Sequence, residues 1–173
     1  MDERASAEFE RAVLAHLDAA YCLARWLTRD EQAAEDLVQD SCVRALRSFG
    51  GFRGENPRAW LLAIVRNACY SWLSKRKTAA SAVEFDDEAE APGAAQDRAA
   101  LAERGAQSRA LRQALEELPP EFREAIVLRE LEGLSYREIA AAAGVPLGTV
   151  MSRLARARRR LERVLAPPAR EEG

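Results

Sequence analysis

The arginines between residues 149 and 163 have the side-chain type and spacing that most clearly indicate a binding function in this sequence. The stretch Val150–Arg160 contains five arginines and no acidic residue. Helical spacing places hydroxyl and cationic groups on one face: Thr149, Ser152, Arg153, Arg156, Arg160 and Arg163. A guanidinium group can donate two parallel hydrogen bonds to a phosphate or to a guanine base. The pattern favours binding to DNA, and a merely solvated amphipathic helix is the alternative.

The residues around these arginines predict the elements that hold them. Ser135 and Glu138 form a capping-box pattern, which predicts a helix that begins at Tyr136 and ends at Gly144. A second helix is predicted to begin near Gly148 or Thr149, and its apolar stripe must face a core: Val150, Leu154, Ala157, Leu161 and Leu165. Two helices joined by a tight glycine-containing turn are typical of a helix-turn-helix.

A second group of cations is interleaved with aromatic residues: Phe52, Arg53, Trp60, Arg66, Tyr70, Trp72, Lys75, Arg76 and Lys77. Exposed rings beside cations suit an unpaired nucleic-acid strand, whose base faces are open to stacking. The alternative is burial in the core, which we expect for Trp60 together with Leu61, Ile64 and Val65. Phe52 is a different case, because it lies in a predicted loop and a bulky ring there needs a reason to stay ordered.

Three helical blocks are predicted to position this second group. Apolar residues at helical spacing indicate amphipathic helices over roughly 9–27 and over Glu31–Ser48. Three glycines and Pro57 interrupt the periodicity, so residues 49–56 are predicted to form a loop. A long helix follows, with Asn56 as its cap and Pro57 in its first turn.

Charge is strongly segregated along a chain whose net charge is only −2. Residues 1–40 hold ten acids and four arginines, a balance of −6, whereas residues 44–77 hold eight basic residues and one acid, a balance of +7. Residues 78–107 and 108–134 are acidic again, at −5 and −2, and residues 135–173 carry +4. Two basic surfaces on either side of an acidic connector indicate a polyanion that is contacted twice.

Composition indicates the fold class and excludes several others. Alanine, leucine, arginine and glutamate dominate and β-branched runs are absent, so we predict an all-α fold. It should comprise two small helical domains, residues 1–78 and 108–167, with a flexible acidic linker over 79–107 and the helix-turn-helix in the C-terminal domain. The polar start and the short apolar run Ala59–Val65 indicate a soluble, cytoplasmic protein.

Cysteine and histidine usage argues against a disulfide framework and a metal site. Cys22, Cys42 and Cys69 are odd in number and widely spaced, so buried free thiols are expected, and redox sensing stays open as an alternative. A single histidine, His16, and the lack of a Cys-x-x-Cys pair argue against a zinc site. No catalytic constellation or nucleotide fingerprint occurs, so neither an enzymatic activity nor a cofactor is expected.

Three stretches of the chain, taken in order, resemble one protein family. They are DEQAAEDLVQDSCVRALRSF, FRGENPRAWLLAIVRNACYSWLSKRK and LPPEFREAIVLRELEGLSYREIAAAAGVPLGTVMSRLARARRRL. The ordered set is similar to bacterial RNA polymerase sigma factors of the extracytoplasmic function (ECF) class. The resemblance implies a transcription initiation subunit that binds core RNA polymerase, recognises promoter DNA and helps melt the minus-ten region. It also implies control by an anti-sigma factor, with any link to a membrane only through that partner, and no small-molecule substrate.

The resemblance assigns expected roles to individual residues. Polymerase binding is expected of Asp36, Leu37, Gln39 and Asp40. A pocket for a base flipped out of the minus-ten element is expected from Phe52, Arg53, Gly54, Glu55, Asn56, Arg66 and Asn67. Contacts to the minus-thirty-five element are expected from Thr149, Ser152, Arg153 and Arg156 in the major groove, and from Arg129 on the adjacent backbone. A plain helix-turn-helix regulator is the alternative, but it would not need the aromatic and basic segment 49–77.

Overall fold

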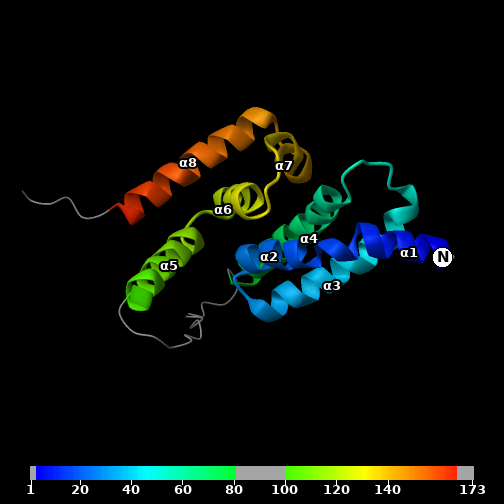
Figure 1. Cartoon of the computed structure of the whole chain (residues 1–173), viewed down its shortest axis with the longest axis horizontal. Coiled ribbons are helices and arrows are strands. Elements are labelled where there is room, and N and C mark those ends of the chain that lie inside the picture. Colours follow the sequence, from blue (N-terminus) through cyan, green and yellow to red (C-terminus); the bar gives the residue numbers. More distant parts are fainter. Residues whose placement is uncertain (1–2, 81–99, 167–173) are drawn as a thin grey trace, which may run out of the picture.

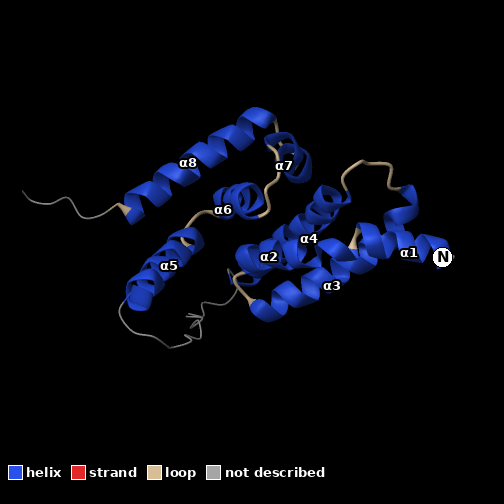
Figure 2. Cartoon of the chain, viewed as in Figure 1, coloured by secondary structure: helices blue, strands red, loops and turns tan. Residues whose placement is uncertain are grey.

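The computed structural model describes residues 3–80 and 100–166, and within these ranges every regular element is a helix (Figure 2). The prediction of an all-α fold is therefore confirmed. We refer to residues 3–80 as the N-terminal half and to residues 100–166 as the C-terminal half. In the described ranges no helix is both long and apolar enough to cross a bilayer.

The N-terminal half is built on three helices that pack against one another. Its helices are α1 (Glu3–Ala12), α2 (Leu17–Thr28), α3 (Glu31–Ser48) and α4 (Pro57–Ala80), and α2, α3 and α4 make mutual contacts (Figure 1). The prediction of one continuous helix over 9–27 is therefore wrong. The backbone leaves the helical course at Val13 and His16, and this turn lets Phe9 and Val13 both enter the core.

Local capping chemistry explains where α3 and α4 begin. Asp30 accepts a hydrogen bond of 2.9 Å from the backbone N–H of Ala33, which satisfies a free donor in the first turn of α3. Asn56 does the same for Ala59 at 3.0 Å, and Pro57 is the first residue of α4. The predicted bounds of α3 and the predicted cap of α4 are both confirmed.

The C-terminal half contains four helices and one π-helical turn. Its elements are α5 (Ala100–Glu116), α6 (Pro120–Ile126), the π turn (Val127–Leu131), α7 (Tyr136–Ala143) and α8 (Leu147–Leu165). The start of α5 overlaps the range predicted as linker, because its alanine-rich first turns favour a helix. Residues 81–99, which hold the rest of the predicted linker, lie outside the described residues.

The helix-turn-helix forms from α7 and α8 as its sequence predicts. Both bonds of the capping box are present, since Ser135 accepts from the N–H of Glu138 and Glu138 accepts from the N–H of Ser135. Gly144 ends α7 in the left-handed region at φ 65°, where a side chain would be strained. The next helix begins at Leu147, slightly earlier than predicted.

The two halves pack together in the described structure. Helix α6 contacts α2, and helix α7 contacts α4 (Figure 1). One cluster of buried apolar residues continues through both halves. The sequence predicts two separate domains but not this contact. The contact brings residues of the predicted DNA surfaces of one half close to the other half.

Candidate nucleic-acid interface

The first half of α8 presents the predicted cationic face to solvent. Val150 and Leu154 are buried at 1% exposure and anchor the helix, whereas Ser152 and Arg156 on the opposite side are exposed. Thr149 and Arg153 are half-buried next to them. We call Thr149, Ser152, Arg153 and Arg156 the α8 surface. An anchored helix with hydroxyl and guanidinium groups near its N-terminal end can enter a major groove.

The far end of α8 departs from the predicted stripe. Ala157 is buried, but Leu161 is half-buried and Leu165 is 41% exposed. The last turns of α8 therefore extend past the part of the core that anchors its beginning.

Arg129 is engaged inside the C-terminal half. Its guanidinium donates a hydrogen bond of 2.9 Å to the carbonyl oxygen of Leu134 and lies 5.0 Å from the centre of the Tyr136 ring. These contacts brace the turn between the π turn and α7. A DNA contact by Arg129, which the resemblance implies, stays a prediction. It would use the guanidinium N–H groups that do not donate to Leu134.

An aromatic cluster orders the loop before α4. The ring of Phe52 lies 4.7 Å from that of Trp60 and 6.3 Å from that of Phe49, centre to centre. Gly54 makes this possible, because a Cβ there would lie 2.8 Å from the Phe52 ring. Arg53 closes the loop with hydrogen bonds to the carbonyl oxygens of Gly50 and Phe52. Phe52 is thus held by packing, and Trp60 is half-buried rather than part of the deep core.

The seven residues predicted to bind the minus-ten element lie in two groups. Phe52, Arg53, Gly54, Glu55 and Asn56 form the loop, while Arg66 and Asn67 lie further along α4 and are joined by a hydrogen bond of 3.2 Å. Asn56 and Arg66 are ten residues apart, which corresponds to about 15 Å along a helix axis. We call these seven residues the loop–α4 surface. The two groups of the loop–α4 surface lie at different positions along the axis of α4. That they form one base pocket stays a prediction.

The predicted polymerase-binding residues share one open face of α3. Asp36, Gln39 and Asp40 are exposed and Leu37 is half-buried, so the helix offers a carboxylate-rich strip beside a partly covered apolar side chain. We call these four residues the α3 surface. Gln32 donates a hydrogen bond of 3.2 Å to Asp36 within the helix. The described contacts of the C-terminal half with α2 and α4 leave this strip accessible.

Three glutamates of the C-terminal half contact the side of the N-terminal half that carries the loop–α4 surface. Glu124 accepts hydrogen bonds from Arg66 and from the hydroxyl of Tyr70, the latter at 2.8 Å. Glu132 accepts from Arg58 at 2.6 Å, and Glu138 accepts from the amide of Asn56. We call Glu124, Glu132 and Glu138 the glutamate triad.

The surroundings of the triad shift several pKa values. Burial and the nearby Glu124 carboxylate raise the pKa of Tyr70 far above its ordinary value, so its hydroxyl stays a donor. Hydrogen bonds from the backbone and side chain of Ser135, and from Asn56, lower the pKa of Glu138, although burial opposes them. Glu138 therefore remains a charged acceptor below the usual carboxyl range.

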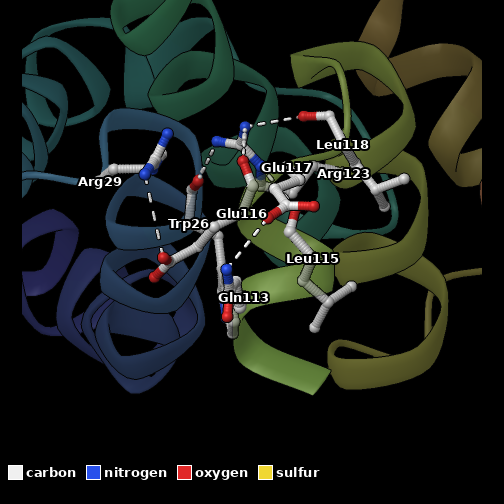
Figure 3. A network of polar contacts seen from close by, with 8 residues as sticks. All are labelled: Trp26, Arg29, Gln113, Leu115, Glu116, Glu117, Leu118 and Arg123. Atoms are coloured by element: carbon white, nitrogen blue, oxygen red, sulfur yellow. Dashed lines mark hydrogen bonds and ion pairs between the residues drawn. The ribbon is translucent and has the colours of Figure 1, made fainter. Parts of the chain in front are cut away.

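A buried arginine ties the ends of two helices together at the seam between the halves. Arg123 is 4% exposed and donates to the carbonyl oxygens of Leu115, Glu116 and Leu118 at the end of α5 (Figure 3). Burial, with Arg29 nearby, lowers the pKa of Arg123 from its ordinary value. On the rim, Arg29 and Glu116 form an ion pair of 3.9 Å. The carbonyl groups at a helix end lack partners in the helix, so one guanidinium can satisfy several of them.

The three cysteines are free thiols of low reactivity. Cys69 is buried, while Cys22 and Cys42 are half-buried, so the prediction of buried thiols is confirmed for Cys69 alone. Burial raises the pKa of Cys22 and Cys69 to about 12, and the Glu132 carboxylate adds to the effect at Cys22. Burial also raises the pKa of Cys42. The reactive form of a cysteine is the thiolate, which such pKa values suppress at neutral pH.

Sequence reasoning missed the residues that join the two halves. Arg58 and the glutamate triad were not expected to be part of any surface, and Tyr70 was expected to face nucleic acid rather than Glu124. The charge balance gave one signal, since the acidic segment 108–134 could have been paired with the basic segment 44–77. Arg123 also donates to the carbonyl oxygen of Trp26 on α2, and no signal in the sequence indicates this contact.

Comparisons with known proteins found one family model that matches each half of the chain. The model of Sigma-70 region 2 matches residues 12–79, and that of Sigma-70, region 4 matches residues 108–161. The chain is 34% identical to the ECF RNA polymerase sigma factor SigE of Mycolicibacterium smegmatis, over 98% of this chain and 66% of that protein. It is 36% identical to the ECF RNA polymerase sigma-E factor of Salmonella typhimurium, over 76% of this chain and 73% of that protein.

A solved structure is similar over almost the whole chain. It is the sigma factor RpoE from Bartonella quintana, in complex with the anti-sigma factor NepR, with a TM-score of 0.74 and 33% identity. The match covers 91% of this chain and 96% of that one.

Proposed function

The chain belongs to the ECF class of RNA polymerase sigma factors, and from this premise we propose how its surfaces direct transcription initiation. It binds core RNA polymerase, carries the enzyme to specific promoters and helps to open the minus-ten region. It acts in the cytoplasm as a regulatory subunit and catalyses no reaction of its own. The observation that carries this proposal is the α8 surface, a cationic face on a helix whose opposite side is anchored in the core.

The α8 surface reads the minus-thirty-five element in the major groove. Arg153 and Arg156 donate to guanine edges or to phosphates, and the hydroxyls of Thr149 and Ser152 supply shorter contacts. Arg129 binds the neighbouring phosphate backbone. The helix that carries this surface is held in position by the Ser135 cap, the Gly144 turn and the burial of Val150.

The loop–α4 surface binds the minus-ten element after its strands separate. Flipping out a base costs a few kcal/mol of stacking, which aromatic contact and base-edge hydrogen bonds offset. Phe52 offers a ring edge, Asn56 and Asn67 offer amides, and Arg66 offers a cation. The α3 surface binds the polymerase, and Leu37 supplies its apolar contact. An anti-sigma factor is a further partner, by analogy with the Bartonella quintana complex.

Run-off transcription with purified core polymerase tests the proposal. Addition of the full chain should give transcripts with defined starts, and their upstream sequences should share two elements at constant spacing. A transcriptional regulator of another kind would bind duplex DNA by itself and would not co-purify with core polymerase. Failure to start transcription at any site in a genomic template would contradict the proposal.

A further inference from the structure

We propose that Met151, with Leu147 beside it, reads thymine methyl groups in the minus-thirty-five element and so determines part of the promoter specificity of this chain. Both side chains lie on α8 next to the α8 surface, and neither belongs to it. The inference rests on the function proposed above for the α8 surface. It adds an apolar contact to the polar and cationic contacts described there.

Two large apolar side chains are exposed at the start of α8. Met151 is 52% exposed and Leu147 is 42% exposed, whereas Val150 and Leu154 on the core side of the same helix are 1% exposed. Neither half of the described chain therefore covers Met151 or Leu147. Removal of apolar surface from water is favourable, so a ligand that covers these side chains gains affinity from them.

Met151 and Leu147 form a row with Ala155. The three residues are spaced four apart, so they follow one another along one side of the helix, and all three are exposed. Ser152 and Arg156 form a second exposed row, roughly 100° further round the helix axis. We call Leu147, Met151 and Ala155 the apolar row. It borders the polar groups of the α8 surface and does not face the core.

A major groove is large enough to contact both rows at once. The groove is about 12 Å wide and about 8.5 Å deep, and a helix with its side chains is about 10–12 Å across. When Ser152 and Arg156 enter the groove, Met151 therefore enters it with them. A base edge beside Met151 then meets an apolar side chain.

Thymine is the base whose groove edge matches the apolar row. In the major groove thymine presents a methyl group on C5, while adenine and guanine present hydrogen-bonding atoms alone. The thioether of Met151 has no N–H group, so it cannot donate to guanine as an arginine does. Its unbranched and polarisable side chain adapts to the shape of an apolar partner. The row therefore favours a T·A pair at the position that it contacts.

The spacing along α8 limits how many bases the apolar row contacts. Leu147 and Met151 are four residues apart, which corresponds to about 6 Å along a helix axis. Neighbouring base pairs are about 3.4 Å apart, so the two side chains span about two base-pair steps. We expect one or two thymines to be read, next to the groups that bind Arg153 and Arg156.

The charges near the apolar row favour DNA as the ligand that covers it. The stretch Val150–Arg160 contains five arginines and no acidic residue, so a polyanion can cover the row and also pair with the cations. Leu131 on the π turn provides a contrast. It is also 52% exposed, but it lies between Glu130 and Glu132 in the sequence, where carboxylates repel a phosphate backbone.

Replacement of thymine by deoxyuridine tests the contact, because it removes the C5 methyl group and nothing else. The duplexes contain a minus-thirty-five element that run-off transcription with this chain has identified, with one thymine replaced at a time. Competition binding of the holoenzyme should show a loss of affinity at one thymine or more. The loss should be about fourfold, as expected for one buried methyl group.

Three variants show whether Met151 makes this contact. Met151→Ala should remove the loss at one of the sensitive thymines, so that thymine and deoxyuridine duplexes bind equally there. Met151→Leu keeps a large apolar side chain and should retain the loss. Leu131→Ala is the matched control of equal exposure and should respond like the wild type. Alanine and leucine are favourable in helices, and circular dichroism confirms that each variant is folded.

Two results would overturn the inference and leave the proposed function in place. In the first, the wild-type holoenzyme starts transcription but binds every deoxyuridine duplex as tightly as its thymine parent. In the second, the loss persists at every sensitive thymine in Met151→Ala, even if this variant assembles less well with polymerase. The absence of any transcription start is seen in the run-off assay itself, and it would overturn the proposed function together with this inference.

Discussion

The guanidinium of Arg123 donates a hydrogen bond of 2.8 Å to the carbonyl oxygen of Trp26, which lies 97 residues earlier in the chain. Trp26 is in the last turn of α2, where carbonyl groups have no partner within the helix. The same guanidinium serves the carbonyl groups at the end of α5 (Figure 3). One side chain therefore supplies donors to carbonyl groups at a helix end in each half of the molecule.

Arg123→Met should be strongly destabilising. The apolar side chain fills similar space but leaves the carbonyl oxygens of Trp26, Glu116 and Leu118 without their donor, and the loss should be about 3 kcal/mol in the free energy of unfolding. The carbonyl oxygen of Leu115 keeps the N–H of Leu118 as a donor. Urea denaturation followed by circular dichroism measures it. Arg11→Met is the control, because Arg11 is exposed and should change stability by less than about 0.5 kcal/mol. Equal stability of the two variants would contradict the role given to Arg123.

Gly54→Ala should disturb the loop although the change adds a single methyl group. The new Cβ would lie 2.8 Å from the Phe52 ring, which must then move away from Trp60. We expect a cost of about 1–3 kcal/mol, as for overpacking elsewhere, and a change in tryptophan fluorescence. Gly51→Ala is a matched control, since nothing lies within 4 Å of its Cβ. The prediction fails if both variants fluoresce like the wild type.

Arg156→Ala should weaken recognition of the minus-thirty-five element without loss of polymerase binding. Removal of a base contact typically costs about 1–3 kcal/mol, and the discrimination between promoter sequences should fall with it. Competition binding of the holoenzyme to promoter duplexes measures both effects. Arg158→Ala removes the same charge from an ion pair with Glu130 and should have only a general, salt-dependent effect. An equal loss of discrimination in both variants would refute a specific role for Arg156.

Asp36→Arg should impair assembly with core polymerase. The substitution reverses a charge on the exposed α3 surface, and we expect the affinity to fall about tenfold or more. Fluorescence titration of the labelled chain with core polymerase measures the change. Glu10→Arg makes the same reversal on α1, outside the predicted surface. If Glu10→Arg weakens assembly as much, net charge rather than the α3 surface accounts for the result.

Stability should fall as the pH rises above the ordinary thiol value. Burial raises the pKa of Cys69 from 9.0 to about 12, so the unfolded chain loses the thiol proton in a range where the folded chain keeps it. Between these values the unfolded state is favoured by about 1.4 kcal/mol per pH unit for this thiol. Well below pH 9.0 the thiol is protonated in both states and contributes no slope.

Cys69→Ala should therefore make the alkaline loss of stability shallower. Urea unfolding at several pH values on either side of 9.0 gives the slope. Val65→Ala is the control, because Val65 is fully buried on the same helix and does not titrate. It should lower stability by a similar amount at every pH. A slope that Cys69→Ala leaves unchanged would contradict the raised pKa.

Features that depend on neighbouring residues could be predicted from the sequence. The Ser135 cap, the Gly144 turn and the bounds of α3 follow from contacts within a few residues, so the sequence pattern contains them in full. The exposed face of α8 was predictable for the same reason. The break between α1 and α2 was not, because it depends on whether Phe9 and Val13 can both reach a core that distant residues build.

The residues of each candidate surface could be predicted from the sequence, but the contacts between the two halves could not. Family resemblance indicated which residues of α4 and α8 to consider, yet Arg66 meets Glu124 across 58 positions and Asn56 meets Glu138 across 82. Such pairs form only when two halves that each fold locally come together. Their chemistry is common to many exposed charges, so no spacing rule distinguishes them from solvated side chains.

The two carboxylate oxygens of Glu138 accept hydrogen bonds from different halves of the molecule. One accepts from the backbone of Ser135 and completes the first turn of α7, while the other meets Asn56 of the opposite half. Detachment of Asn56 thus leaves the start of α7 intact. The start of the helix-turn-helix is therefore stabilised by residues of its own half and does not depend on the contact with Asn56.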